Sequence, residues 1–194
     1  LTHNGVTVSW TTNEAADTQV EYGLTTSYGT STILNTTLVT SHSVGLNGLA
    51  AGTTYHYRVK SRDAAGNLAT SGDFTFTTAA APDTTAPTIS GVGTSGLTPT
   101  SVTVNWTTNE AADTQVEYGL TTSYGSSTTL NSAMVTSHSA GLSGLTANTT
   151  YHYRVNSRDA AGNLQTSADF TFTTAAPPDT TAPLDRWLAS RPAR

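Results

Sequence analysis

The chain has 194 residues, a formal net charge of −5 and no cysteine. Without cysteine it has no disulfide bond, no catalytic thiolate and no cysteine-based zinc site. Lys60 is the only lysine, and the basic residues are too scattered to form the basic face that nucleic-acid binding requires. No run approaches the roughly 18 apolar residues of a membrane-spanning helix, so we expect no membrane span.

The sequence contains an internal repeat. Residues 6–10 (VTVSW) recur at 102–106 (VTVNW), and residues 6–87 then align with 102–183 without a gap. Only 14 of these 82 positions differ, which indicates a recent duplication. We expect repeat one at 1–78, a linker at 79–87, repeat two at 88–174, and a linker and tail at 175–194. The short, proline-containing linker is typical of a semi-rigid spacer.

Each repeat has the pattern of short strands rather than of helices. Apolar residues alternate with polar ones, which is the period of a half-buried strand. In chain order these are Val6, Val8 and Trp10, then Val20 and Tyr22, Val44 and Leu46, Tyr55, Tyr57 and Val59, and Phe74 and Phe76. Turn-forming residues lie between them at 13–17, 28–29, 47–48 and 63–67. The pattern predicts an antiparallel β-sandwich for each repeat.

Both repeats resemble the fibronectin type III module. The residues that carry the resemblance are Trp10, the spacing from Leu49 to Tyr55, and the Tyr-His-Tyr-Arg-Val segment, with Trp106, Leu145 and Tyr151 in repeat two. It implies an all-β fold of two tandem seven-stranded antiparallel sandwiches. It also implies structural roles for Trp10, Tyr55, Trp106 and Tyr151. The two tyrosines would be tyrosine-corner residues, whose hydroxyls bond to the backbone near Leu49 and Leu145.

The two repeats differ where they begin. Residues 86–95 supply a first strand, strand A, to repeat two, whereas only residues 1–5 precede the second strand of repeat one. We therefore expect strand A of repeat one to be missing or shortened. The tail carries Leu184, Trp187 and Leu188 at the spacing of a short apolar face. This face would dock on a partner or on the edge left by strand A, or the tail is a frayed end.

Five histidines raise the possibility of a metal site: His3, His42, His56, His138 and His152. His42 and His56 fall on strands of opposite sheets in the expected fold and should not converge. We expect His56 and His152 on the solvent face, and His42 and His138 near the start of a strand.

Acidic residues of the expected turns are candidates for calcium binding. The ligand set would be Glu110, Asp113 and Asp159 of repeat two with Asp83 of the linker. The turn at 63–67 lacks the alternating oxygen ligands of an EF-hand loop. Asp, Asn and Gly are also the usual turn formers, which explains the same residues without a metal. We therefore expect no cofactor, with calcium as the alternative.

Two further pairs face outward from the expected sheets. Glu21 and Arg58 lie on neighbouring strands and predict a cross-strand ion pair, repeated at Glu117 and Arg154. Tyr28 and Tyr124, in Ser-Tyr-Gly turns, are the aromatic candidates for a glycan-binding face, although turn packing explains them equally well.

No catalytic constellation is visible, since there is no Gly-x-Ser-x-Gly motif and no recognisable Ser, His and Asp spacing. We predict a non-catalytic structural or spacer module of an extracellular or cell-surface prokaryotic repeat protein. Its partners would be neighbouring repeats or copies of the same protein, and no nucleic acid. One alternative is a filament subunit completed by strand donation between chains. Another is an accessory module that binds a surface polysaccharide.

Overall fold

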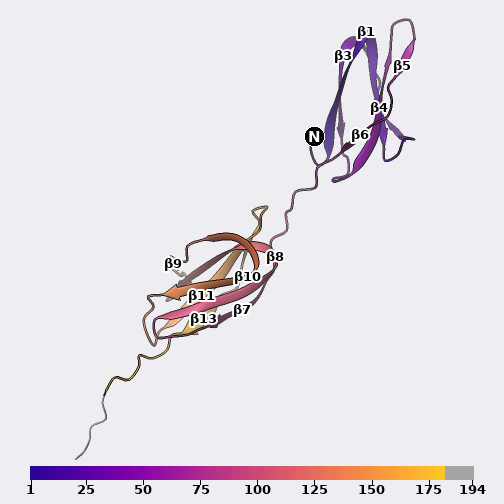
Figure 1. Cartoon of the computed structure of the whole chain (residues 1–194). Helices are drawn as coiled ribbons and strands as arrows, with labels where there is room; N and C mark the ends of the chain where they lie inside the picture. The colour runs from indigo at the N-terminus through magenta and orange to yellow at the C-terminus, as the bar shows by residue number, and fades with distance from the viewer. Residues whose placement is uncertain (182–194) are drawn as a thin grey trace, which may run out of the picture. The chain divides into compact units, whose positions relative to one another are not determined.

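The computed structural model describes residues 1–181 of the chain (Figure 1). The chain divides into two compact units, Leu1–Asp83 and Thr84–Arg194. All regular elements among the described residues are strands, so the all-β prediction is confirmed. No helix in this part of the chain is long and apolar enough to cross a membrane.

The first unit has six strands. They are β1 (Gly5–Gly23), β2 (Thr30–Ser31), β3 (Asn35–Asn47), β4 (Thr54–Arg62), β5 (Leu68–Thr70) and β6 (Phe74–Thr77). The first part of β1 pairs with β3, and its last part pairs with β2 and β4. β4 also pairs with β5 and β6. All pairings are antiparallel, and β1 passes from one sheet of the sandwich to the other.

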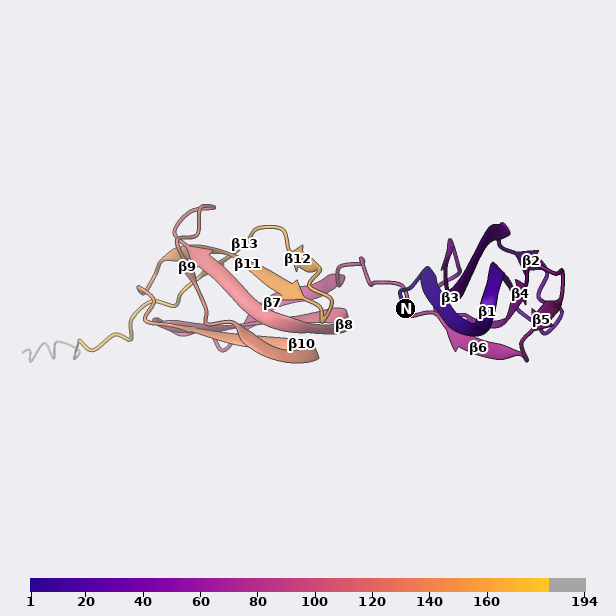
Figure 2. The same cartoon turned by 90° about the horizontal axis from the view of Figure 1, so that it is seen from above.

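The second unit repeats this topology with one additional strand. Its strands are β7 (Ile89–Ser95), β8 (Ser101–Gly119), β9 (Ser126–Ser127), β10 (Asn131–Ser143), β11 (Thr150–Arg158), β12 (Leu164–Thr166) and β13 (Phe170–Thr173). One sheet holds β7, β8 and β10, and the other holds β9, β11, β12 and β13 with the last part of β8. In Figure 2, β10 and β11 lie in opposite layers of this unit. The predicted seven strands are thus present in repeat two.

The core of each unit lies between its two sheets and consists of the alternating apolar residues. In the second unit it includes Val104, Trp106, Val116 and Val155, all 0–2% exposed. Their neighbours in sequence are more exposed, because successive side chains of a strand point to opposite faces. The alternation read from the sequence therefore identifies the buried face correctly.

One predicted turn is wrong. Residues 13–17 were expected to form a turn, but they lie inside β1. The pairing with β3 shifts register between Thr11 and Ala16, so the strand bends through a β-bulge instead of breaking. Such a bulge bends a strand and increases its twist, which lets one strand serve both sheets. Residues 63–67 do form a turn, which lies next to this bend through the bridge between Ala16 and Asp63.

The described strands of the first unit include no counterpart of β7, and this has a visible effect on burial. In the second unit β7 pairs with the first part of β8. The matching edge of β1 has no such partner among the strands of the first unit. Trp10, Tyr55 and Tyr57 are only half-buried there, whereas their counterparts in the second unit are buried. Because the two repeats are nearly identical in sequence, β7 is the main cause of this difference.

The Ser-Tyr-Gly turns have an unusual backbone. Tyr28 and Tyr124 have φ angles of 61° and 58°, in the left-handed region that favours glycine. The turn folds back onto Gly23, where an added Cβ would lie 1.4 Å from the carbonyl oxygen of Tyr28. Only glycine fits at that position, which explains why Gly119 stands at the same place in repeat two.

Candidate functional site

A polar cluster lies on the sheet formed by β8, β11 and β13 in the second unit. Glu117 on β8 is directly opposite Arg154 on β11, and their side chains form an ion pair at 2.5 Å. The guanidinium of Arg154 covers the ring of Tyr124, 4.7 Å from its centroid. The Tyr124 hydroxyl donates to Asp169 at 3.1 Å, and His152 Nδ1 lies 2.8 Å from the same carboxylate. We call these five residues the Tyr–Arg cluster.

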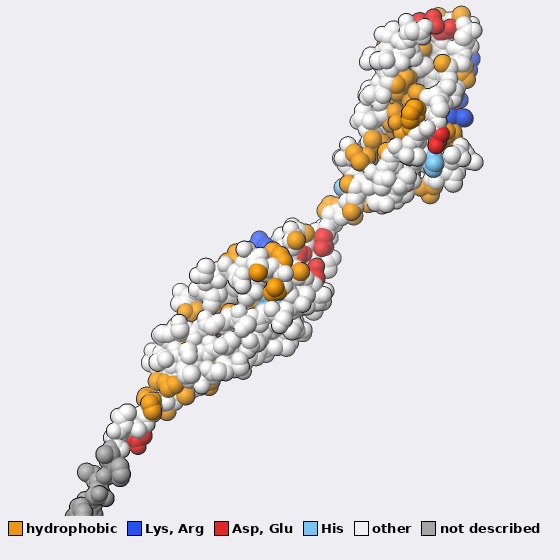
Figure 3. Space-filling model, in the orientation of Figure 1, with side chains coloured by type: hydrophobic (Ala, Val, Ile, Leu, Met, Phe, Trp, Pro, Cys, Tyr) orange, Lys and Arg blue, Asp and Glu red, His pale blue; other side chains and the backbone are white. Residues whose placement is uncertain are grey.

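The first unit carries the same cluster from the matching residues. They are Glu21, Tyr28, His56, Arg58 and Asp73, with Lys60 as an additional cation on Glu21 at 3.1 Å. Figure 3 shows basic, acidic and histidine atoms close together on one flank of this unit. The predicted ion pairs Glu21–Arg58 and Glu117–Arg154 are confirmed.

The internal contacts of this cluster explain its electrostatics. The hydrogen bond from Arg58 holds the pKa of the Glu21 carboxyl below its usual range. Burial, and then the hydrogen bond to Asp169, raise the pKa of the Tyr124 hydroxyl. Both the ring and the hydroxyl of the tyrosine already have partners within the unit. This favours turn packing over a free aromatic platform for a sugar.

A second conserved arrangement of the two repeats lies in the core around the tryptophan. The ring of Trp106 stacks on His138 at 5.0 Å with an interplanar angle of 8°. The indole Nε1–H donates to the hydroxyl of Ser157 at 3.0 Å. Trp10, His42 and Ser61 form the same arrangement in the first unit.

The hydrogen bonds around His138 determine its tautomer. The Thr108 hydroxyl donates its only hydrogen to the Glu110 carbonyl at 2.6 Å, so it accepts from His138 Nε2–H at 2.9 Å. Nδ1 then accepts from the Thr114 hydroxyl at 2.7 Å. Burial lowers the pKa of His138, and the charge of Asp113 opposes this effect. His138 is therefore a neutral core residue.

The position predicted for this histidine is wrong. His42 and His138 were expected near a strand start, but they lie in the middle of β3 and β10, and each is 2% exposed. The sequence signal that was missed is the alternation along the strand. His42 is two residues before Val44 and four before Leu46, so its side chain points to the same inward face. The hydroxyl partners could not be found this way, since the bend of β1 brings Thr12 and Thr18 to the ring.

The acidic residues considered for calcium have separate environments. Asp113 is buried, and its Oδ1 accepts from the backbone N–H of Arg158 at 2.7 Å, so it joins β8 to β11. Asp159 accepts from the backbone and side-chain nitrogens of Asn163 at 2.9 and 2.8 Å. Burial raises the pKa of Asp159, but the hydrogen bonds from Asn163 and from the backbone of Gly162 and Ala161 together lower it below its usual range.

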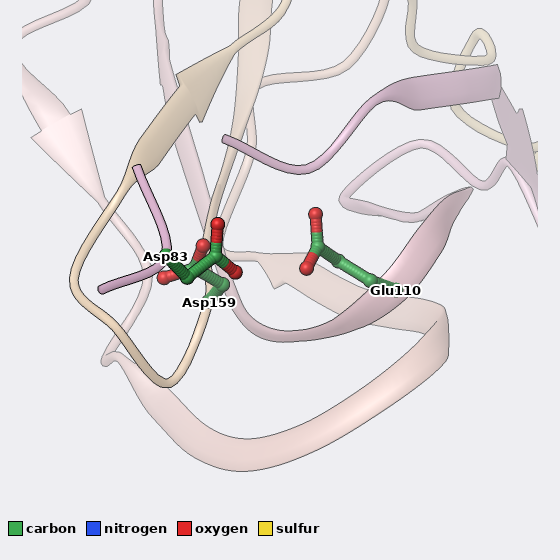
Figure 4. Close-up of side chains that lie close together, drawn as sticks. All are labelled: Asp83, Glu110 and Asp159. Carbon is green, nitrogen blue, oxygen red and sulfur yellow. The ribbon is translucent and has the colours of Figure 1, made fainter. Parts of the chain in front are cut away.

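The carboxylates of Glu110 and Asp159, both in the second unit, approach each other, with oxygens within 4.8 Å (Figure 4). The third labelled residue, Asp83, belongs to the first unit. The bonds to Asn163 are those of a turn-forming aspartate. Calcium binding by Glu110, Asp113, Asp159 and Asp83 stays a prediction.

The two predicted tyrosine-corner residues lie at the starts of β4 and β11. The hydroxyl of Tyr151 accepts from the backbone N–H of Thr146 at 3.0 Å, and Tyr55 accepts from Ala50 at 3.0 Å. This is the geometry of a tyrosine corner. The apolar tail residues Leu184, Trp187 and Leu188 lie outside the described residues.

Comparison with known proteins places this geometry in a family. The family described as "Purple acid Phosphatase, N-terminal domain" matches residues 2–78 and 91–174, which is one match per unit. The chain belongs to this family. The two matched segments are fibronectin type III-like β-sandwiches, as the resemblance implied. The family name denotes a domain and assigns no reaction to this chain.

Relatives similar to the chain have the names of polysaccharide-degrading enzymes. Exoglucanase B of Cellulomonas fimi is 38% identical over 94% of this chain but only 17% of its own length. Chitinase A1 of Niallia circulans is 34% identical over 87% of the chain and 23% of its own length. Endoglucanase B of Cellulomonas fimi is 38% identical over 94% of the chain and 18% of its own length. The chain thus spans less than a quarter of each relative.

Among solved structures, the chicken CNTN1 FN1-FN3 domains match 90% of this chain and 63% of that chain. The identity is 18% and the TM-score is 0.38, a likeness too weak to add to the fold assignment.

Proposed function

We propose that the two repeats are a non-catalytic accessory and spacing module of an extracellular polysaccharide-degrading protein. The observation that carries this proposal is the match to a minor part of three relatives named as glucanases and a chitinase. A segment that recurs in enzymes named for different substrates is better explained by a shared mechanical role than by a shared reaction.

The chemistry of the described residues supports a non-catalytic role. Every buried side-chain nitrogen and oxygen in residues 1–181 has a hydrogen-bond partner. The core histidine His138 is neutral, buried and bonded at both ring nitrogens. The charged groups of the Tyr–Arg cluster are paired with one another, Glu117 with Arg154 and His152 with Asp169. Catalytic sites instead keep titratable groups available in a cleft.

A chimeric enzyme tests this function. The chain is placed between a glucanase catalytic domain and a cellulose-binding domain, and is compared with a single repeat and with a glycine/serine linker of equal length. We expect equal rates on soluble oligosaccharides and different rates on insoluble cellulose. Equal rates on both substrates for all three chimeras would refute a spacing role. Release of reducing sugar by the chain alone would refute the non-catalytic assignment.

The filament alternative rests on the edge of β1 in the first unit, the position at which β7 pairs with β8 in the second unit. An added strand there would extend the sheet by backbone hydrogen bonds. Sedimentation velocity over a wide concentration range is the test. Only monomers at every concentration would count against the filament.

A further inference from the structure

The second unit contains a groove that the spacing role does not use. It lies between β9 and β10 and has a volume of about 360 Å³. Its wall is formed by Thr114, Tyr118, Thr128, Thr129, Asn131 and residues 139–143. We call it the β9–β10 groove. Its volume is within the range of about 300–1,000 Å³ that is usual for small-ligand sites.

The lining of this groove is polar and uncharged. None of its ten residues is Asp, Glu, Lys, Arg or His. An ionic ligand would find no partner of opposite charge there, so the lining selects for a neutral ligand. The polar groups are hydroxyls and one amide, which can both donate and accept. That combination suits a ligand made largely of hydroxyl groups.

Several of these polar groups have no partner within the described part of the chain. The hydroxyls of Tyr118, Thr129, Ser139 and Ser143 form none of the hydrogen bonds found among residues 1–181, and only Tyr118 of these four residues is partly buried. Tyr118 is the informative one, because its ring packs against the core while its hydroxyl is left over. A tyrosine fixed in this way offers an apolar ring and a polar tip to one ligand. Thr114 and Thr128 already bond to His138 and Val116.

The matching residues of the first repeat show which lining positions are smaller in the second repeat. Among the positions that differ between the repeats, three line it, and at each of them the first repeat has the larger side chain. Ile33, Val44 and Asn47 stand where the second repeat has Thr129, Ala140 and Ser143. Nothing lies within 4 Å of the position that a Cβ would take at Gly141, between the last two of these residues.

We propose that the β9–β10 groove binds one or two sugar units of a neutral glycan, with Tyr118, Asn131 and Ser143 as the contacting side chains. The first unit has larger side chains at three of the matching positions, so we expect no comparable site there. The site lies on a different strand pair from the Tyr–Arg cluster and does not depend on the spacing role.

Nuclear magnetic resonance on the whole chain tests this inference. The isotope-labelled protein is titrated separately with cellohexaose and with chitohexaose. Saturable shifts are expected at Tyr118, Asn131 and residues 139–143 with at least one sugar. The matching amides of the first unit serve as an internal control and should not move. The affinity of so small a site is expected to be weak, with a Kd on the order of 1 mM.

Two variants separate the groove from a general surface effect. Replacing Thr129→Ile, Ala140→Val and Ser143→Asn together installs residues that the same fold already accepts in the first unit. We expect this variant to fold and to bind at least tenfold more weakly. Tyr118→Phe removes only the hydroxyl and should also weaken binding, whereas the control Tyr22→Phe should not.

Three outcomes would overturn the inference. The first is no saturable shift with either sugar. The second is binding that the filled groove leaves unchanged, or shifts that gather around Tyr124 instead. The third is tighter binding of polygalacturonate, an acidic polysaccharide, than of the neutral sugars.

Discussion

The hydrogen bond between Trp106 and Ser157 gives the most specific test of the core. Ser157 is 0% exposed and Trp106 is 2% exposed, so water cannot replace either partner. Ser157→Ala removes the acceptor and leaves the indole N–H buried without a partner. An unsatisfied buried donor costs about 1–3 kcal/mol, and we expect the free energy of unfolding of the second unit to fall by that amount.

The first unit supplies the matched control. Trp10 donates to Ser61 at 3.1 Å in the same geometry, but its ring is only half-buried because β7 has no counterpart there. Ser61 is itself 5% exposed, but because Trp10 is less buried than Trp106 we expect water to reach the freed indole N–H more easily in the Ser61→Ala variant. The expected cost is the net value of one hydrogen bond, about 0.5–1.5 kcal/mol, and lower than the cost at Ser157.

The assay is urea unfolding of the whole chain, followed through resolved amide resonances of each unit. Each substitution should shift the midpoint of its own unit and leave the other unchanged. Equal costs at the two serines, or a larger cost at Ser61, would refute the argument that burial by β7 sets the value of this bond. Adding Trp106→Phe to Ser157→Ala should cost less than the sum of the two single changes, since both partners are then gone.

Three further predictions use the same unfolding assay. Because burial lowers the pKa of folded His138, the unfolded state gains a proton more readily than the folded state as the pH falls below about 6.5. Stability should therefore decrease from pH 7 to 5, and His138→Gln should reduce this slope. An unchanged slope contradicts the neutral assignment. Glu117 and Arg154 should show a coupling of about 0.2–1 kcal/mol in a double-mutant cycle, because the pair is partly exposed, and no coupling would contradict the contact. The first unit should unfold at lower urea than the second because its core is less covered, and the reverse order would contradict that reasoning.

Much of the fold could be predicted from local sequence. The alternation at Val6, Val8 and Trp10 identifies both the strand and its buried face, because the side-chain period of a strand is fixed at two. The pair Glu21–Arg58 followed from the same alternation together with the expected neighbourhood of the two strands. Turn residues such as Gly29 and Gly66 were identified because they supply backbone angles that other residues rarely adopt.

The candidate sites were harder to predict, because they depend on where strands bend. Residues 13–17 carry turn-forming side chains, yet pairing across both sheets keeps them extended within β1. That bend brings Thr12 and Thr18 to His42, and no local sequence pattern predicts the bend. The β9–β10 groove was missed for a related reason. It depends on which side chains the segment after β9 and the edge of β10 bring together.

The sequence by itself determined that this protein is a duplicated all-β module, because repetition and alternation are properties of the chain read in order. It also showed that residues 86–95 place a strand before the repeated segment of repeat two. Only the tertiary structure decided what that strand does. β7 covers a tryptophan that its absence leaves half-buried in the first unit, since burial depends on which strand lies across the sheet edge and not on the residue itself.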